Sequence, residues 1–159
     1  MADHRVTIRR GRRTDFTAVM ELLAEEGVPL PPADRTTLRR FRRLVADLGT
    51  DFYVAVIDGR IEGLVHVTYA RQLTQGATAT LERLVVAEAC GDNGIGMALL
   101  RFAQRRARNR GCARFSCALP ASAHDRREFL ERSGLEAHGE WLAVYWTAAR
   151  ASEPAPAKG

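Results

Sequence analysis

The sequence predicts a layered α/β domain with a mixed central sheet of about six to seven strands and about four flanking helices. Runs rich in β-branched residues alternate with segments whose apolar residues recur at helical spacing. Read along the chain, these patterns give the order β-α-α-β-β-β-α-β-α-β-β, with no internal repeat. A chain of 159 residues can bury a core without disulfides. We therefore expect one domain over residues 1–147 and a disordered tail over 148–159.

The amino-terminal part predicts a strand followed by two helices. Residues 6–9 are typical of a strand, and Thr14 is the expected cap of a helix closed by Gly27. The apolar stripe of this helix is Phe16, Val19, Met20 and Leu23. The proline-rich segment 28–32 cannot be helical throughout. Asp34 then caps a second helix, ended by Gly49, with an expected buried face of Leu38, Phe41, Val45 and Leu48.

This second helix carries arginines at positions 39, 40, 42 and 43. They fall around the side opposite its apolar residues. We interpret them as a solvated face rather than a binding patch.

The rest of the chain predicts strands with two further helices between them. The dipeptide Asp58-Gly59 is a strong hairpin signal between strands over 52–57 and 61–70. Residues 73–78 are polar and turn-like, and the central strand and helix follow. Gly111 ends that helix. Further elements are expected at 113–119 (a strand), 124–132 (a short helix) and 141–147 (the last strand).

The most informative stretch runs from Thr80 to Arg106. A short apolar run, Leu81 and Leu84 to Val86, predicts a buried strand. Glycines at 91, 94 and 96 interrupt it, and apolar residues then recur at helical spacing: Ile95, Ala98, Leu99 and Phe102. A glycine turn that opens a helix presents unpaired N–H groups at the positive end of the helix dipole, which suits a pyrophosphate.

Other glycine-rich motifs do not match this stretch. The Rossmann fingerprint needs glycine or alanine at position 99, which is Leu99, and no Gly-Lys-Ser/Thr follows for a P-loop. A turn with a purely structural role stays open at this point.

The whole stretch resembles the acetyl-CoA motif of the GCN5-related N-acetyltransferase (GNAT) superfamily. The residues that carry the resemblance are Glu82-Arg83-Leu84-Val85-Val86 and, after the turn, Gly94-Ile95-Gly96-Met97-Ala98. A weaker likeness extends over about 6–147. Two positions depart from the family pattern: Gly91 stands where the family has Gln or Arg, and Asp92 where it usually has glycine.

The resemblance implies a mostly antiparallel sheet that splays apart at its central strands and binds acetyl-CoA there. The pantetheine arm would pair with the backbone of Leu84, Val85 and Val86, and an N–H near Val85 or Val86 would meet the oxyanion. The pyrophosphate would bind at the turn and helix start, formed by Gly91, Asp92, Asn93, Gly94, Ile95, Gly96 and Met97. The N–H donors are expected over Asp92–Met97.

Acetyl transfer to an amine also needs a base, and Glu82 is the candidate. Its place on the central strand matches a glutamate used by some GNAT members. The alternative is a partly exposed strand residue paired to Arg83 or to another arginine. The family's usual tyrosine acid is absent: alignment places Leu130 there and Ala123 at the motif's asparagine. Possible substitutes are His66, Tyr69, His124 and Tyr145.

We therefore expect an acetyl-CoA-dependent N-acetyltransferase in which the amine attacks the thioester directly. The alternative is a catalytically inactive acyl-CoA-binding or interaction module with the same fold. The acceptor, a small-molecule or peptide amine, and the acyl group carried are not determined by the sequence. A homodimer is possible.

Composition excludes several other classes. The net charge of +5 comes almost wholly from arginine, but no zinc-finger spacing or RNA-stacking motif accompanies it, so we expect no nucleic acid. No apolar run reaches membrane length, and we expect a cytoplasmic protein without a membrane partner.

Cys90, Cys112 and Cys117 form no C-x-x-C, and the four histidines show no metal-ligand spacing. Cys112 and Cys117, five apart on the expected strand, should face opposite sides. We expect no metal.

Overall fold

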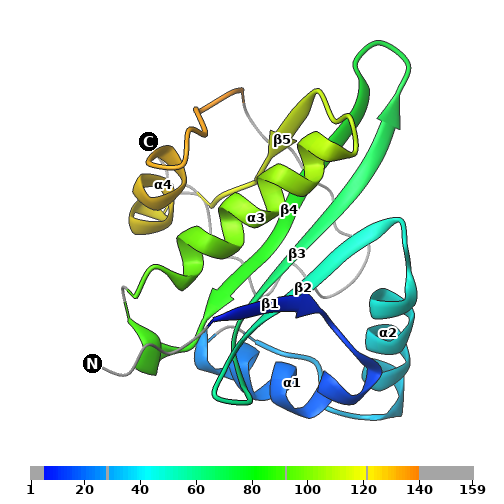
Figure 1. Cartoon of the computed structure of the whole chain (residues 1–159), viewed down its shortest axis with the longest axis vertical. Coiled ribbons are helices and arrows are strands. Elements are labelled where there is room, and N and C mark those ends of the chain that lie inside the picture. The colour runs from blue at the N-terminus through cyan, green and yellow to red at the C-terminus, as the bar shows by residue number, and fades with distance from the viewer. Residues whose placement is uncertain (1–5, 28, 92, 121, 140–159) are drawn as a thin grey trace.

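The computed structural model describes residues 6–27, 29–91, 93–120 and 122–139. There the chain forms one sheet in the order β1-β2-β3-β4-β5 (Figure 1). The strands are β1 (Thr7–Arg10), β2 (Thr50–Ile57), β3 (Arg60–Gln72), β4 (Gly76–Val86) and β5 (Arg114–Ser116). The helices are α1 (Phe16–Glu25), α2 (Arg35–Ala46), α3 (Ile95–Asn109) and α4 (His124–Glu131), with 3-10 turns η1 (Arg13–Asp15) and η2 (Glu88–Cys90).

The mixed α/β class is confirmed, although the described residues hold five strands rather than six or seven. The strand expected over 141–147 and the tail over 148–159 lie outside the described residues. The Asp58-Gly59 hairpin is confirmed: both residues have positive φ, as the tight turn between β2 and β3 requires.

The sheet is antiparallel except at β4 and β5. These two strands run parallel and pair over only three positions, ending at Thr80 and Ser116. Beyond that point β5 ends, while β4 continues to Val86. The expected splay at the central strands is therefore present.

Helices cover both faces of the sheet, because successive strand residues point to opposite sides. One core lies under α1 and α2 and contains Val19, Leu22, Phe41, Val45, Phe52, Val54, Leu64 and Val85. The other lies under α3 and α4 and contains Ala55, Val65, Val67, Ala79, Leu81, Ile95, Leu99, Leu100 and Leu130. Figure 1 shows α3 running alongside β4 and β3, with α1 and α2 grouped at the other side of the molecule.

One glycine decides how closely α3 approaches the sheet. A Cβ at Gly63 of β3 would lie 2.9 Å from Leu99 Cδ1 and 3.3 Å from Ile95 Cγ2. A side chain there would press on Leu99 and Ile95, so these two residues would have to move. The absence of a side chain at Gly63 thus lets the start of α3, which presents the candidate anion site, pack closely on the sheet.

The amino-terminal helices differ from the expectation at their ends. Thr14 does not cap α1. It lies inside η1, and Asp15 is the N-cap residue, although its carboxylate is bound to Arg9. Asp34 caps α2 as expected and accepts hydrogen bonds from the N–H groups of Thr36 and Thr37, each at 2.9 Å. Leu48 lies beyond the end of α2 and is 77% exposed, so its assignment to the buried face was wrong.

Two predicted elements in the later part of the chain have different bounds in the structure, and one predicted orientation is wrong. The expected turn over 73–78 is shorter because β4 already begins at Gly76. β5 covers only Arg114–Ser116 of the expected 113–119. Cys112 and Cys117 both lie outside that short strand and pack against the same core, so their expected placement on opposite faces was wrong.

Candidate functional site

The carboxyl half of β4 has one open edge. Residues 81–86 pair with β3 on one side, whereas among the described residues the pairing with β5 has ended at Thr80. The backbone N–H and C=O groups along such an edge are free to bond another extended chain. The predicted pantetheine-binding residues lie on this segment: Leu84 and Val86 contact the core under α3, and Val85 contacts the opposite core.

The chain then turns from β4 into α3 through two glycines with positive φ. Gly91 has a φ of 46° and Gly94 a φ of 76°, which glycine adopts without the steric cost that other residues incur. The first intrahelical hydrogen bond runs from the Ala98 N–H to the Gly94 C=O at 2.9 Å. The four N–H groups at positions 94–97 therefore have no partner within the helix.

Fewer backbone N–H groups are free to bind a ligand than the sequence predicts for Asp92–Met97. The Asn93 N–H donates to the Cys90 C=O at 3.2 Å, so it closes the turn instead of facing a ligand. Asp92 lies outside the described residues. The remaining candidate donors are those of Gly94, Ile95, Gly96 and Met97.

The two glycines at the start of α3 differ in the space around them. A Cβ at Gly94 would meet no atom within 4 Å, so the backbone is open on that side. A Cβ at Gly96 would lie 3.4 Å from both Val86 Cγ2 and Phe129 Cζ. The side of Gly96 that lacks a side chain therefore faces Val86 of β4 and Phe129 of α4, beside the open edge of β4.

Glu82 occupies a β-bulge. His66 of β3 pairs with Arg83 and Val67 pairs with Leu81, so Glu82 is the extra residue of β4. Its carboxylate Oε1 accepts a hydrogen bond from Thr68 Oγ1 at 2.5 Å and is exposed. Among the described residues, the alternative pairing with Arg83 is not formed, because Arg83 binds a different carboxylate.

That carboxylate is Glu26, directly after α1. Glu26 accepts from Arg83 Nη1 at 2.6 Å and from Arg126 Nη2 of α4 at 3.3 Å. The two ion pairs connect α1, β4 and α4 around the residue next to Glu82. No local sequence pattern marks Glu26, because its partners are 57 and 100 residues away along the chain.

His66 lies opposite this part of β4. Its ring stacks at an angle on Phe52, with the centroids 5.8 Å apart, and its Nε2 is buried without a hydrogen-bond partner among the described residues. Burial lowers the pKa of His66 below 6.5, although the charge of Glu82 acts in the opposite direction. The imidazole of His66 is therefore harder to protonate than an exposed one.

The candidate residues for a general acid lie in different parts of the structure. Leu130, at the position of the family's tyrosine, is 3% exposed and belongs to the core under α3. Tyr69 donates its hydroxyl proton to Asp51 Oδ2 at 2.7 Å, and burial together with that carboxylate raises its pKa, so it is unsuited to this role. His124 is exposed at the start of α4. Tyr145 lies outside the described residues.

Asp51 holds the far end of α3 to the sheet. Its carboxylate, 3% exposed, accepts from Arg106 Nε at 2.6 Å and from Arg110 Nη2 at 3.0 Å. Burial alone would raise the pKa of Asp51, but the hydrogen bonds from Arg106 and Tyr69 hold it below 3.8. These contacts fix the helix whose other end forms the glycine turn. No sequence motif marks them.

Cysteine and metal chemistry have no support in the described part of the chain. Cys90, Cys112 and Cys117 are free thiols, and burial raises the pKa of each. No cluster of three or more His, Cys, Asp or Glu residues in those ranges could hold a metal ion. None of the described helices is long and apolar enough to span a membrane.

Comparisons with known proteins agree with this geometry. A model of the acetyltransferase (GNAT) family matches residues 16–135. A search of curated proteins found no match.

Solved structures of similar fold include a transcriptional regulator from Bacillus halodurans C-125, with 27% identity, a TM-score of 0.80 and coverage of 89% of this chain and 100% of that chain. Glucosamine-6-phosphate N-acetyltransferase from Arabidopsis thaliana has 18% identity, a TM-score of 0.77 and coverage of 90% and 99%. Ribosomal-protein-alanine N-acetyltransferase from Brucella melitensis biovar Abortus 2308 has 19% identity, a TM-score of 0.74 and coverage of 90% and 100%. At these identities the last two show the fold alone.

Proposed function

Because the chain belongs to the GNAT acetyltransferase family, we propose that it is an N-acetyltransferase that moves the acetyl group of acetyl-CoA directly to an amine. One structural observation carries the proposal. Within residues 81–97, a strand with an open edge, a bulged carboxylate and a helix start with free N–H groups follow one another. The open strand edge would bind the pantetheine arm, the bulged carboxylate would deprotonate the amine, and the helix start would bind the pyrophosphate.

The backbone supplies most of the binding groups. The open edge of β4 at Leu84–Val86 would hold the pantetheine arm as an added strand, and the N–H groups at 94–97 would hold the pyrophosphate. Acetyl-CoA supplies the acetyl group as a thioester. An N–H of Val85 or Val86 is the proposed donor to the oxygen on which negative charge develops.

Glu82 is the proposed base. An amine with a pKa near 10.4 is neutral in only about one molecule in 2,500 at pH 7, and only the neutral form attacks. Glu82, acting directly or through water, would take the amine proton as the C–N bond forms and the C–S bond breaks. Thr68 holds the carboxylate on the face of the sheet that carries α1.

The leaving group does not require a side-chain acid at position 130. A thiol of pKa near 8.5 departs as a thiolate at modest cost, and Leu130 is buried in the core. Protonation of the thiolate by water completes the reaction.

The acceptor is proposed to be a small-molecule or peptide amine that enters beside Glu82. Related folds act on very different amines, since one neighbour is named for glucosamine 6-phosphate and another for an alanine of a ribosomal protein. Glu26 and Arg83, which lie next to the proposed base, are the charged groups that an incoming acceptor would meet.

A screen of amine acceptors with acetyl-CoA, followed by release of free thiol, tests this function. Turnover with at least one amine, absent in Glu82→Gln, is the expected result. Calorimetry separates the alternatives: binding of acetyl-CoA without turnover across a broad panel of sugar, polyamine, amino-acid and peptide amines would favour an inactive acyl-CoA-binding module. Failure to bind acetyl-CoA would contradict both.

A further inference from the structure

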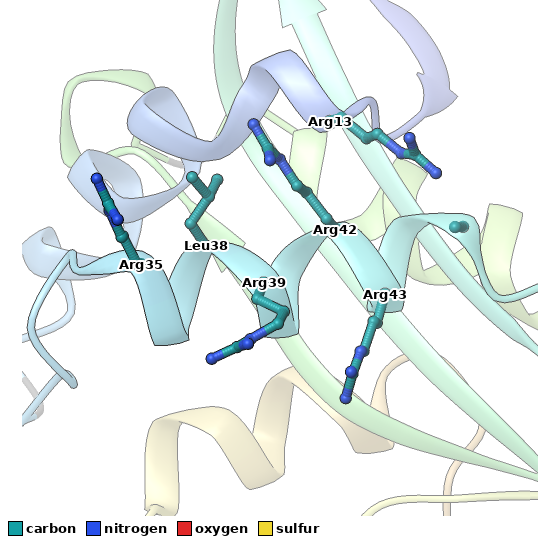
Figure 2. A pocket seen from close by; sticks show the side chains of 7 residues that line it. Arg13, Arg35, Leu38, Arg39, Arg42 and Arg43 are labelled. Atoms are coloured by element: carbon teal, nitrogen blue, oxygen red, sulfur yellow. The ribbon is translucent and has the colours of Figure 1, made fainter.

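Five arginine side chains line a surface hollow of about 620 Å³ beside α2 (Figure 2). They belong to Arg13 of η1 and to four residues of α2, namely Arg35, Arg39, Arg42 and Arg43. Those four positions follow the spacing i, i+4, i+7 and i+8, which places them on one face of the helix. The arginines are exposed, as the sequence analysis expected, but they line one concave site.

Among the described residues, the side chains of these five arginines form no ion pair or hydrogen bond. Several other arginines of the chain are paired. Arg9 binds Asp15, Arg106 and Arg110 bind Asp51, and Arg83 binds Glu26. Five like charges around one hollow repel one another, and a partner that carries negative charge would remove that repulsion.

The floor of the hollow is apolar. Leu38 and Ala46 line it together with the methylene stems of the arginines. Among the described residues, its lining contains no aromatic side chain on which a base could stack. A ligand that fits both parts needs acidic groups for the rim and apolar groups for the floor.

We propose that this hollow is a docking site for an acidic polypeptide segment in which carboxylates alternate with apolar side chains. Arginine forks bind carboxylates in bidentate geometry, and Leu38 offers apolar contact that a phosphodiester backbone could not use. The undescribed ends of this chain are not suitable occupants, because residues 1–5 contain one acidic residue and 140–159 contain two. The proposed occupant is a segment of another protein.

This site is separate from the acetyl-transfer site. α2 packs on β2, and β3 lies between β2 and β4. None of the residues that line the hollow belongs to the open edge of β4 or to the glycine turn. Docking there would bring a partner protein to the enzyme without competing with acetyl-CoA.

The test uses the full chain and fluorescence anisotropy at physiological ionic strength. The probe is a labelled peptide as long as α2, 12 residues, in which glutamate pairs alternate with leucines. A glutamate-only peptide and a single-stranded oligonucleotide of equal length serve as comparators. Arg39→Gln, Arg42→Gln and Arg43→Gln are combined in one variant. The control combines Arg40→Gln, Arg71→Gln and Arg105→Gln, three exposed arginines that do not line the hollow.

The glutamate–leucine peptide is expected to bind more tightly than either comparator. The hollow variant should weaken it about tenfold or more, equal to about 1.4 kcal/mol, and the control variant less than about threefold. Leu38→Gln should weaken the glutamate–leucine peptide but not the glutamate-only peptide. Melting curves establish that each variant is folded.

Three results would overturn the proposal. Equal losses in the two triple variants would show an effect of net charge alone. Tighter binding of the oligonucleotide, with the same dependence on the hollow arginines, would assign the site to nucleic acid. Absence of peptide binding to the wild-type protein would leave the arginines as a solvated face.

Discussion

Glu82 Oε1 accepts a hydrogen bond from Thr68 Oγ1 at 2.5 Å, and this contact exists because Glu82 is the extra residue of a β-bulge. In a regular strand, neighbouring residues point to opposite faces. The bulge instead allows both Glu82 and Arg83 to reach partners on the face that carries α1: Thr68 and Glu26. A proposed base and an ion pair thus lie side by side at the open edge of β4.

Glu82→Gln should lower kcat about 100-fold, because a positioned base contributes roughly 10²–10⁴-fold and the amide cannot accept the amine proton. Affinity for acetyl-CoA, measured by calorimetry, should stay near the wild-type value. Thr68→Val should lower kcat more modestly, since it removes only the hydrogen bond that orients the carboxylate. Glu21→Gln, at an exposed position of α1, is the matched control. Wild-type turnover of Glu82→Gln between about pH 6 and 9 would assign the base to another residue.

Replacement of Gly94 and Gly96 with valine should weaken acetyl-CoA binding about tenfold or more. Valine is strained at the φ of 76° found at Gly94, and a side chain at Gly96 would fill the space beside Val86 and Phe129. Gly111→Val controls for strain alone, because Gly111 has a φ of 75° and lies after the opposite end of α3. Unchanged acetyl-CoA affinity in a folded double variant would show that acetyl-CoA does not bind at the glycine turn.

Leu130→Tyr should destabilise the protein by about 1–3 kcal/mol, because Leu130 is buried in the core and tyrosine adds volume and a polar hydroxyl there. Leu130→Phe is the matched control, since it differs from tyrosine only by the hydroxyl. If no acid is needed, both variants should change kcat by less than about tenfold. A jump in turnover in Leu130→Tyr but not in Leu130→Phe would show that an acid had been missing.

Asp51→Asn should lower the free energy of unfolding by about 2 kcal/mol, because a buried carboxylate paired with three arginines (Arg10, Arg106 and Arg110) and hydrogen-bonded by Tyr69 loses its charge. The folded-state pKa of Asp51 lies below 3.8, so its contribution is present above that pH and is lost as the pH falls through the folded value. The free energy of unfolding should therefore fall less steeply in the variant than in the wild type as the pH is lowered into the acid range. Asp125→Asn, exposed on α4, should cost less than about 0.5 kcal/mol. Equal urea midpoints for the two variants would contradict the anchoring role.

His66 should make stability depend on pH just below neutrality. Burial lowers the pKa of His66 in the folded protein below 6.5, so the unfolded chain takes up its proton first as the pH falls. The stabilising contribution is complete above about pH 6.5 and decreases as the pH falls toward the folded-state pKa. His66→Phe keeps a ring against Phe52 and should flatten the Tm profile between about pH 7 and 5. Identical profiles for the variant and the wild type would refute this assignment.

Much of the fold follows from local sequence patterns. Helical periodicity located α1, α2 and α3, and Asp58-Gly59 located the first hairpin, because these signals depend on neighbours along the chain. The errors lie at element ends. Leu48 continues the apolar spacing of α2, but the helix has ended at Ala46, and β5 is shorter than its apolar residues suggested. Contacts with other elements decide such boundaries.

By itself, the sequence determined the family, the alternation of strands and helices, and the order of strand, glycine turn and helix that marks the candidate acetyl-CoA site. Only the tertiary structure decided which charged groups meet. Glu82 faces Thr68 instead of Arg83, Glu26 joins α1 to β4 and α4, and Asp51 holds the far end of α3. The physical reason is that these pairings are set by strand register, a bulge and helix docking, so partners 14 to 100 residues apart come together without any pattern along the chain.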